Sequence, residues 1–355
     1  MTVETIVANI TGNPKEDDKI YDKAGEILRA GGLVAFPTET VYGLGADALD
    51  VKASAKIYAA KGRPSDNPLI VHIADRNDLY KLAEEVPETA LKLADAFMPG
   101  PITIILKKKE CVPGETTGGL DTVAIRMPRH PVAARMIRES GVYVAAPSAN
   151  TSGRPSPTKA KYVIEDLNGK VDMIIADDTV DIGIESTIVD LSEEVPTVLR
   201  PGYITLEMLR KVLGRVEIDK AVEAGNILAS DIAPKAPGMK YRHYAPKAEL
   251  TIVSGNEDSV AQKINELVSK RLEDGAKVGI MTTDENIYRY TKGEVRSLGL
   301  RADEATVAKN LFAVLREFDD IGAEYIYSEA FANSNVGQAV MNRLIKAAGH
   351  SIIEV

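Results

Sequence analysis

The stretch 214–248 divides this sequence into two parts, each with the pattern of an α/β fold. It has little periodicity and carries prolines at 234, 237 and 246. A structureless connection of this length is unusual inside a compact fold and usually marks a linker or a functional loop. We therefore expect one domain over 1–213, an interdomain connection over 214–248 and a smaller domain over 249–355.

Short apolar runs alternate with helical spacing on both sides of that connection. In the first part, strands are expected at 33–36, 69–73, 102–106, 123–126, 142–145, 184–190 and 197–199, with helices at 51–61, at 79–98 (broken near Pro87) and at 206–213 after an N-cap at Thr205. In the second part, strands at 250–253, 278–281, 325–327 and 352–353 alternate with helices at 259–272, 306–318 and 339–348. This alternation predicts a small, Rossmann-like parallel sheet.

The charge balance excludes some partners. With 43 Lys and Arg against 52 Asp and Glu, the net charge is −9, which argues against coating nucleic acid by bulk charge. A phosphate ligand would need a local basic patch. The single cysteine, Cys111, excludes internal disulfides and multi-cysteine zinc sites. No apolar run reaches the roughly 18 residues of a membrane helix and no signal-peptide pattern is present, so we expect a cytoplasmic protein with no membrane partner.

Several catalytic signatures are missing. The sequence contains no phosphate-binding loop of the Walker type, no dinucleotide fingerprint and no nucleophile elbow. Its four histidines have no metal-ligand spacing. A hydrolase triad, a zinc hydrolase and an ordinary dinucleotide enzyme are therefore not expected.

Polar loops that carry glycine follow several of the expected strands, where open sheets place their ligands. They cover 37–47, 61–68, 145–153 and 183–188. Lys61 and Arg63 flank a glycine and suit phosphate oxygens, although cations are also ordinary at a helix C-terminus. Arg126 ends an apolar strand and needs a partner, either a ligand carboxylate or an Asp or Glu of the protein. A lone strand histidine such as His72 is more often structural.

Together these segments resemble the YrdC family. The resemblance rests on Pro37-Thr38-Glu39-Thr40-Val41-Tyr42-Gly43-Leu44, Lys61-x-Arg63, Pro68-Leu69, Ser148-x-Asn150 with Gly153, Glu185-Ser186-Thr187 and Leu199-Arg200-Pro201-Gly202. It covers roughly residues 15 to 210. The segment 237–246 and the α/β tail are similar to the longer, two-domain threonylcarbamoyl-AMP synthases. The family fold, a twisted α/β sheet with a basic cleft, is the fold that the resemblance implies for the first domain.

The resemblance implies an L-threonylcarbamoyladenylate synthase, a nucleotidyltransferase. Such an enzyme makes threonylcarbamoyl-AMP and pyrophosphate from L-threonine, bicarbonate or CO₂, and ATP, with Mg²⁺. The product would pass to a separate Kae/TsaD-type transferase for threonylcarbamoyladenosine formation on tRNA, so tRNA would be met at most indirectly. The metal ligands are left open.

The resemblance also implies two groups of site residues. The threonine pocket would be lined by Thr40, His72, Arg126, Ala146, Ser186 and Thr187, with Arg126 on the carboxylate. The nucleotide would be surrounded by Lys61, Arg63, Asn67, Thr122, Ser148, Asn150, Ser156, Arg200 and Tyr241. The residues expected to carry catalysis are Lys61, Arg63 and Arg126.

The residue chemistry agrees with this reaction. The amine of threonine captures CO₂ and the carbamate attacks the α-phosphorus of ATP, so no protein nucleophile is needed. Positioning and cationic donors supply most of phosphoryl-transfer catalysis. Because the mixed anhydride is prone to hydrolysis, we also expect residues 234–246, which include Tyr241 and Arg242, to cover the site; a passive basic linker is the alternative.

Two other functions remain open from the residues alone. An RNA-binding module is disfavoured by the acidic balance, the 5% of aromatic residues and the lack of tryptophan. A carbamoyltransferase of hydrogenase maturation also contains a YrdC-like domain, but that family needs cysteine-rich zinc segments, which one cysteine cannot supply.

Overall fold

The computed structural model describes residues 3–223, 234–237, 243–331 and 335–355. The chain forms two compact units. The first consists of Met1–Ser152, Ser156–Asp181 and Glu185–Lys240. The second consists of Tyr241–Val355 together with two short pieces from the first half of the chain, Gly153–Pro155 and Ile182–Ile184. The chain therefore leaves the first unit and returns to it twice before the C-terminal unit begins.

A mixed sheet of eleven strands, in the order β1-β8-β2-β3-β7-β4-β6-β5-β9-β10-β11, forms the described part of the first unit. The strands are β1 (Ile6–Asn9), β2 (Val34–Phe36), β3 (Gly43–Asp47), β4 (Ile70–His72), β5 (Ile102–Lys107), β6 (Thr122–Arg126), β7 (Val144–Ala145), β8 (Met173–Ala176), β9 (Thr187–Asp190), β10 (Thr197–Arg200) and β11 (Glu217–Ile218). The helices are α1 (Pro14–Arg29), α2 (Val51–Lys61), α3 (Leu79–Leu82), α4 (Glu88–Phe97), α5 (Gly114–Thr117), α6 (Pro131–Ser140), α7 (Ala160–Leu167), α8 (Leu206–Leu213) and α9 (Lys220–Glu223).

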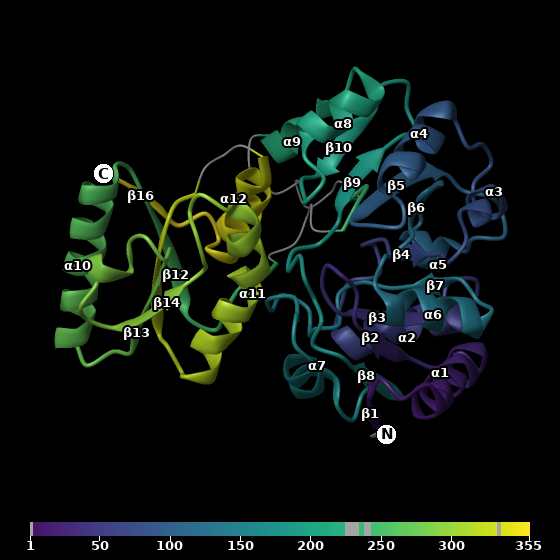
Figure 1. Cartoon of the computed structure of the whole chain (residues 1–355), viewed down its shortest axis with the longest axis horizontal. Helices are drawn as coiled ribbons and strands as arrows, with labels where there is room; N and C mark the ends of the chain where they lie inside the picture. The colour runs from purple at the N-terminus through teal and green to yellow at the C-terminus, as the bar shows by residue number, and fades with distance from the viewer. Residues whose placement is uncertain (1–2, 224–233, 238–242, 332–334) are drawn as a thin grey trace. The chain divides into compact units, whose positions relative to one another are not determined.

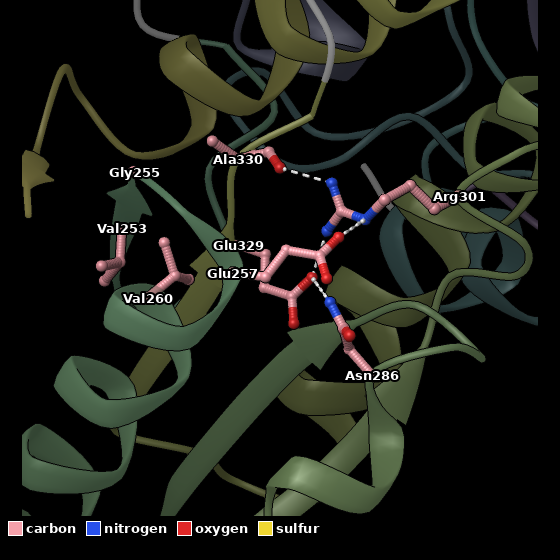
Figure 2. A pocket seen from close by; sticks show the side chains of 8 residues that line it. All are labelled: Val253, Gly255, Glu257, Val260, Asn286, Arg301, Glu329 and Ala330. Carbon is pink, nitrogen blue, oxygen red and sulfur yellow. Dashed lines mark hydrogen bonds and ion pairs between the residues drawn. The ribbon is translucent and has the colours of Figure 1, made fainter.

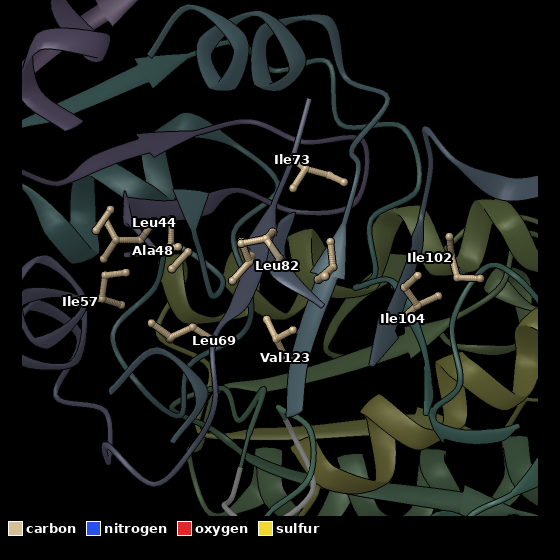
Figure 3. Close-up of a cluster of buried hydrophobic side chains, with 14 of the residues drawn as sticks. Leu44, Ala48, Ile57, Leu69, Ile73, Leu82, Ile102, Ile104 and Val123 are labelled. Atoms are coloured by element: carbon tan, nitrogen blue, oxygen red, sulfur yellow. The ribbon is translucent and has the colours of Figure 1, made fainter. Parts of the chain in front are cut away.

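The central strands of this sheet are apolar on both faces, but the two faces pack differently. Alternate residues such as Ile104 and Val123 point into the main core (Figure 3), to which Val71 also belongs. The residues between them form a smaller cluster on the opposite face, made of Ile70, Ile105, Ala124, Ile188, Leu199 and Ala236. Part of the 214–248 connection therefore packs on the second face, through Ala236.

The second unit has a parallel sheet of five strands in the order β14-β13-β15-β12-β16. Its elements are β12 (Glu249–Ser254), α10 (Glu257–Glu273), β13 (Val278–Thr282), β14 (Glu294–Ser297), α11 (Glu304–Asp320), β15 (Tyr325–Glu329), α12 (Asn335–Ala347) and β16 (Ile352–Glu354). Helix α10 lies on one face, and α11 and α12 lie on the other (Figure 1). Strand alternation explains this, because Val278 and Ile280 pack on α10 whereas Gly279 between them contacts Phe318 of α11.

The predicted fold class, a twisted α/β sheet with a second, parallel α/β domain, is confirmed. Several elements differ from expectation. The expected loop at 37–47 contains β3, and the connection 214–248 contains β11 and α9, whereas the helix expected at 79–98 is interrupted near Pro87 as predicted and forms α3 and α4. Strand β3 has the sequence Gly-Leu-Gly-Ala-Asp, which lacks the β-branched residues that favour a strand. It forms a strand because it pairs with β2 and β7.

Candidate active site

The strand register brings residues that are predicted to bind the substrate threonine to one edge of the first unit's sheet. His72 and Arg126 end the parallel strands β4 and β6 and lie directly opposite each other. Both occupy the alternate positions of Ile70 and Ala124, so their side chains share the sheet face that lies away from the main core. His72, Arg126 and Ala146 are all buried.

Arg126 has an ion-pair partner inside the protein. Its Nη2 lies 2.8 Å from Oε1 of Glu39, and the two side chains are only 5% and 2% exposed. Burial raises the pKa of the Glu39 carboxyl, but the adjacent guanidinium outweighs this and holds the pKa below its ordinary value. The sequence leaves two partners open for Arg126, a ligand carboxylate or an acidic residue of the protein. The structure contains the second of these, Glu39. Arg126 Nε is also buried and has no hydrogen-bond partner among the residues that the structure describes, which leaves a donor for a ligand.

His72 is neutral. Its Nδ1 lies 3.0 Å from the Ile70 carbonyl, so Nδ1 carries the proton and donates it. Burial, with the nearby Arg126 charge, lowers the pKa of His72 to about 3. Near pH 7 this ring offers a hydrogen-bonding nitrogen without a positive charge.

We expect the buried His72 to make the fold sensitive to mild acid. Its pKa is about 3 in the folded state against 6.5 for the free side chain, so between these values the unfolded state binds the additional proton. Stability is therefore lost as the pH falls from about 6.5 toward 3. Relative to His72→Asn, which keeps a donor for Ile70, the wild type should lose about 1 kcal/mol of unfolding free energy per pH unit between pH 6 and pH 5.

Urea unfolding of both proteins at a series of pH values measures this difference. His130, whose pKa is also lowered by burial, is present in both proteins and cancels. Parallel pH profiles for the two proteins would contradict a neutral, buried His72.

The hydroxyl of Thr40 is arranged to accept a hydrogen bond. Thr38 Oγ1 donates to the Val41 carbonyl at 2.6 Å and lies 2.9 Å from Thr40 Oγ1. Since the proton of Thr38 is already used, the proton of this second bond comes from Thr40. Thr40 Oγ1 therefore has only lone pairs left to offer, and it adjoins Glu39 and so the Arg126 pair.

The side chain of Thr187 is not brought into this group. Thr187 alternates with Ile188 and so shares the main-core side with Val189. Its hydroxyl donates to the Ile204 carbonyl at 2.7 Å and its main-chain nitrogen donates to Pro101. Thr187 therefore has no free donor left for the role that is predicted for it in the threonine pocket.

Ser186 and Arg200 form the neighbouring part of the same edge. Arg200 Nε donates to the Ser186 carbonyl at 3.0 Å and Nη2 to its hydroxyl at 3.1 Å. Ser186 Oγ also lies 2.8 Å from Thr103 Oγ1. The resemblance predicts that Arg200 contacts the nucleotide, and the structure places it beside Ser186 of the threonine group.

The remaining nucleotide residues gather around the end of α2. The buried Lys61 ammonium donates to the carbonyls of Ser148 and Asn150, and Ser148 donates to Asn150 Oδ1 at 2.6 Å. Arg63 Nη2 donates to the Asn67 and Pro68 carbonyls at 3.3 and 3.2 Å. Lys61 thus links the 61–68 loop to the 145–153 loop, and Arg63 holds the turn of its own 61–68 loop.

An unused acceptor lies within the nucleotide group. The side-chain oxygen Oδ1 of Asn67 is buried and has no hydrogen-bond partner in the described part of the chain. Thr122 begins β6, and since Ala124 pairs with Ile70, Thr122 lies at the level of the Asn67–Pro68 turn. The parallel strands β4 and β6 therefore run from the nucleotide group toward the threonine group.

Two predicted residues lie apart from these contacts. Ser156 is buried, and its hydroxyl donates to Glu185 Oε1 at 2.6 Å. Tyr241, together with Arg242 of the expected cover, lies outside the described residues. At the end of that segment, Tyr244 is buried in the second unit, 5.1 Å from the ring of Phe312 between centroids.

The structure adds residues to which sequence reasoning gave no role: Glu39, Thr38, Thr103 and Glu185. Glu39 and Glu185 stand inside the family motifs, so a charge at a strand end was a usable signal. Thr103 gave none, because it lies in a β-branched apolar run and only the register places it beside Ser186.

The second unit also contains a pocket, at the carboxyl ends of β12, β13 and β15 (Figure 2). Its buried carboxylate, Glu329, accepts hydrogen bonds from Thr282, Tyr290 and Asn286 at 2.7–3.2 Å and pairs with Arg301. These contacts compensate the charge of Glu329 inside the protein. We therefore place the candidate active site on the sheet of the first unit.

In residues 3–223, 234–237, 243–331 and 335–355, no three His, Cys, Asp or Glu side chains cluster as metal ligands. No helix in those ranges is long and apolar enough to cross a membrane. Cys111 is a free, exposed thiol.

The sheet and site define a two-domain α/β protein with a buried cationic site on the first domain. Residues 26–202 match the Sua5_yciO_yrdC family model, described as "Telomere recombination". Residues 204–349 match the model of the threonylcarbamoyl-AMP synthase C-terminal domain.

Relatives match over nearly the whole chain. The threonylcarbamoyl-AMP synthase of Pyrococcus abyssi is 50% identical over 99% of this chain and 100% of its own length, and that of Bacillus subtilis is 46% identical over 97% of each. The crystal structure of P. abyssi Sua5 complexed with L-threonine superposes with a TM-score of 0.90, at 48% identity over 99% of both chains. The chain belongs to the threonylcarbamoyl-AMP synthase family, in its two-domain form.

Proposed function

We propose that this protein makes threonylcarbamoyl-AMP and pyrophosphate from L-threonine, bicarbonate or CO₂, and ATP. The observation that carries the proposal is the buried Arg126, whose Nε lacks a partner in the described chain, next to the neutral His72. An arginine with an unused buried donor suits a carboxylate ligand. A relative with 48% identity has been crystallised with L-threonine.

The two residue groups supply the two halves of the reaction. The carboxylate of threonine binds Arg126. The carbamate formed on the amine of threonine has to reach the α-phosphorus of ATP, and ATP is surrounded by Lys61, Arg63 and the Ser148–Asn150 loop. Arg200 lies beside Ser186, so it offers a cation next to the threonine group. This cation can stabilise the negative charge that develops on the phosphate during the transfer. Fixed donors aimed at developing charge are the main source of catalysis in such transfers.

We propose that Mg²⁺ enters with ATP as part of the substrate. The described residues contain no acidic cluster that would hold a resident metal. Mg²⁺ is commonly held by substrate phosphates and water with one or two carboxylates, and Glu185 is a buried carboxylate in this region.

The product would be consumed by a group transferase that modifies tRNA, of the Kae/TsaD type. We place the protein in the cytoplasm, because its one cysteine is a free thiol and free thiols persist in reducing compartments. Direct binding of tRNA is not required by this chemistry.

We expect pyrophosphate release from labelled ATP to require L-threonine, bicarbonate and Mg²⁺ together. The measurement is release with each component omitted in turn, with Arg126→Met as a control that should release little pyrophosphate at threonine concentrations near the KM of the wild type. Release that is independent of threonine would contradict the proposed function and indicate another nucleotide reaction.

A further inference from the structure

Helix α11 of the second unit holds two short segments that belong to the first half of the chain. These segments, Gly153–Pro155 and Ile182–Ile184, group with the second unit. Each is followed at once by a residue of the candidate site, Ser156 in one case and Glu185 in the other.

The segment 153–155 is held by two charged side chains of α11. Arg316 is fully buried and donates twice to the Pro155 carbonyl, from Nε at 3.0 Å and from Nη2 at 2.8 Å. The Asp319 carboxylate forms an ion pair with Arg154 Nη2 at 3.2 Å. It also accepts a hydrogen bond from the Lys247 main-chain nitrogen at 2.7 Å. A planar guanidinium that donates two hydrogen bonds to one carbonyl holds that carbonyl in position and direction.

The segment 182–184 is held by backbone packing on the same helix. Gly183 has φ +83°, and a Cβ added there would lie 2.4 Å from Cα and the carbonyl oxygen of Lys309. Only glycine allows this close approach in this conformation. The flanking Ile182 and Ile184 are buried.

The two held segments lead directly into one hydrogen bond. Ser156 follows Pro155, Glu185 follows Ile184, and the Ser156 hydroxyl donates to Glu185 Oε1 at 2.6 Å. Ser156 is a candidate nucleotide residue, and Glu185 precedes Ser186, which Arg200 contacts. The spacing between the two segments on α11 therefore sets the distance that this bond must span.

We propose that α11 is a positioning element for the candidate active site, with Arg316 as its main positioning residue and Gly183 as its second contact. Through the chain itself, Arg316 fixes Ser156, which the family resemblance assigns to the nucleotide, and Gly183 fixes Glu185-Ser186, of which Ser186 belongs to the threonine group. This gives the second unit a defined role in the reaction. The inference rests on the proposed function.

The two contacts predict different kinetic effects. Arg316→Met should raise the KM for ATP about tenfold and leave the KM for L-threonine within about twofold, because a shift of about an ångström in a positioning group is costly. Gly183→Ala should raise the KM for L-threonine more than that for ATP. Arg316→Lys keeps one donor for the Pro155 carbonyl and should restore part of the ATP affinity.

A matched control separates positioning from general loss of stability. Ile264 is fully buried in α10 and packs on the other face of the sheet from α11. Ile264→Ala should lower the thermal midpoint as Arg316→Met does, yet leave both KM values unchanged. If Arg316→Met does not fold, Asp319→Asn, which releases Arg154 while keeping an acceptor for Lys247, should raise the KM for ATP by about threefold.

Two outcomes would overturn the inference. One is unchanged KM values in folded Arg316→Met and Gly183→Ala proteins; the other is equal effects on both substrates in these variants and in Ile264→Ala. The wild type serves as the test of the proposed function itself. A wild type without threonine-dependent pyrophosphate release rejects that function, whereas an active wild type with unaffected variants rejects only the role of α11.

Discussion

Replacing Arg126 with methionine is expected to raise the KM for L-threonine by roughly two to three orders of magnitude. Truncating one member of a buried charge pair costs about 2–5 kcal/mol, and the pair here would be the guanidinium and the substrate carboxylate. The change is measured as the KM for threonine in pyrophosphate release and as the Kd for threonine by calorimetry.

The internal partner of Arg126 complicates this variant and also provides its control. Arg126→Met leaves the Glu39 carboxylate buried without its cation, which destabilises the fold. The double variant Glu39→Gln/Arg126→Met removes both charges and should recover the thermal midpoint. Threonine binding should remain lost in the double variant. Recovery of threonine binding together with stability would show that Arg126 acts only as the partner of Glu39.

Valine is expected to be used on the order of 10⁴-fold less efficiently than threonine. The two side chains differ in that valine has a methyl group in place of the hydroxyl, and a site built to hydrogen-bond a hydroxyl rejects an analogue without one by this factor. We expect Thr40 to accept this hydrogen bond, because its own proton goes to Thr38. Thr187 has its hydroxyl committed to Ile204.

Serine and a Thr40 variant complete this test. Serine lacks only a methyl group, worth ~1 kcal/mol when buried, so it should be used about tenfold less efficiently than threonine. Thr40→Val keeps the side-chain shape and should lose most of the preference for threonine over valine. Equal turnover of serine, valine and threonine by the wild type would refute this account of the pocket.

Local sequence signals located most elements that carry apolar runs. Strands β2, β4, β5 and β6, the helix after Thr205 and the parallel C-terminal sheet lie where the sequence predicts them, because buried strands and amphipathic helices have strong local patterns. Elements β1, β8, β14, α1, α6 and α7 have no predicted counterpart. The two strands missed inside expected loops share a cause. Strand β3 is rich in glycine, and β11 has two residues, so each is a strand only through its pairing partners.

The sequence by itself located the polar, glycine-bearing loops at strand ends, because such loops are a local feature of the chain, and its resemblance to the YrdC family predicted which of their residues belong to the candidate site. Only the tertiary structure decided what each residue contacts. The pairing of Glu39 with Arg126, the turn of the Thr187 side chain toward the core and the capture of 153–155 by Arg316 join positions far apart along the chain. Such contacts depend on strand register and helix packing, which no local pattern encodes.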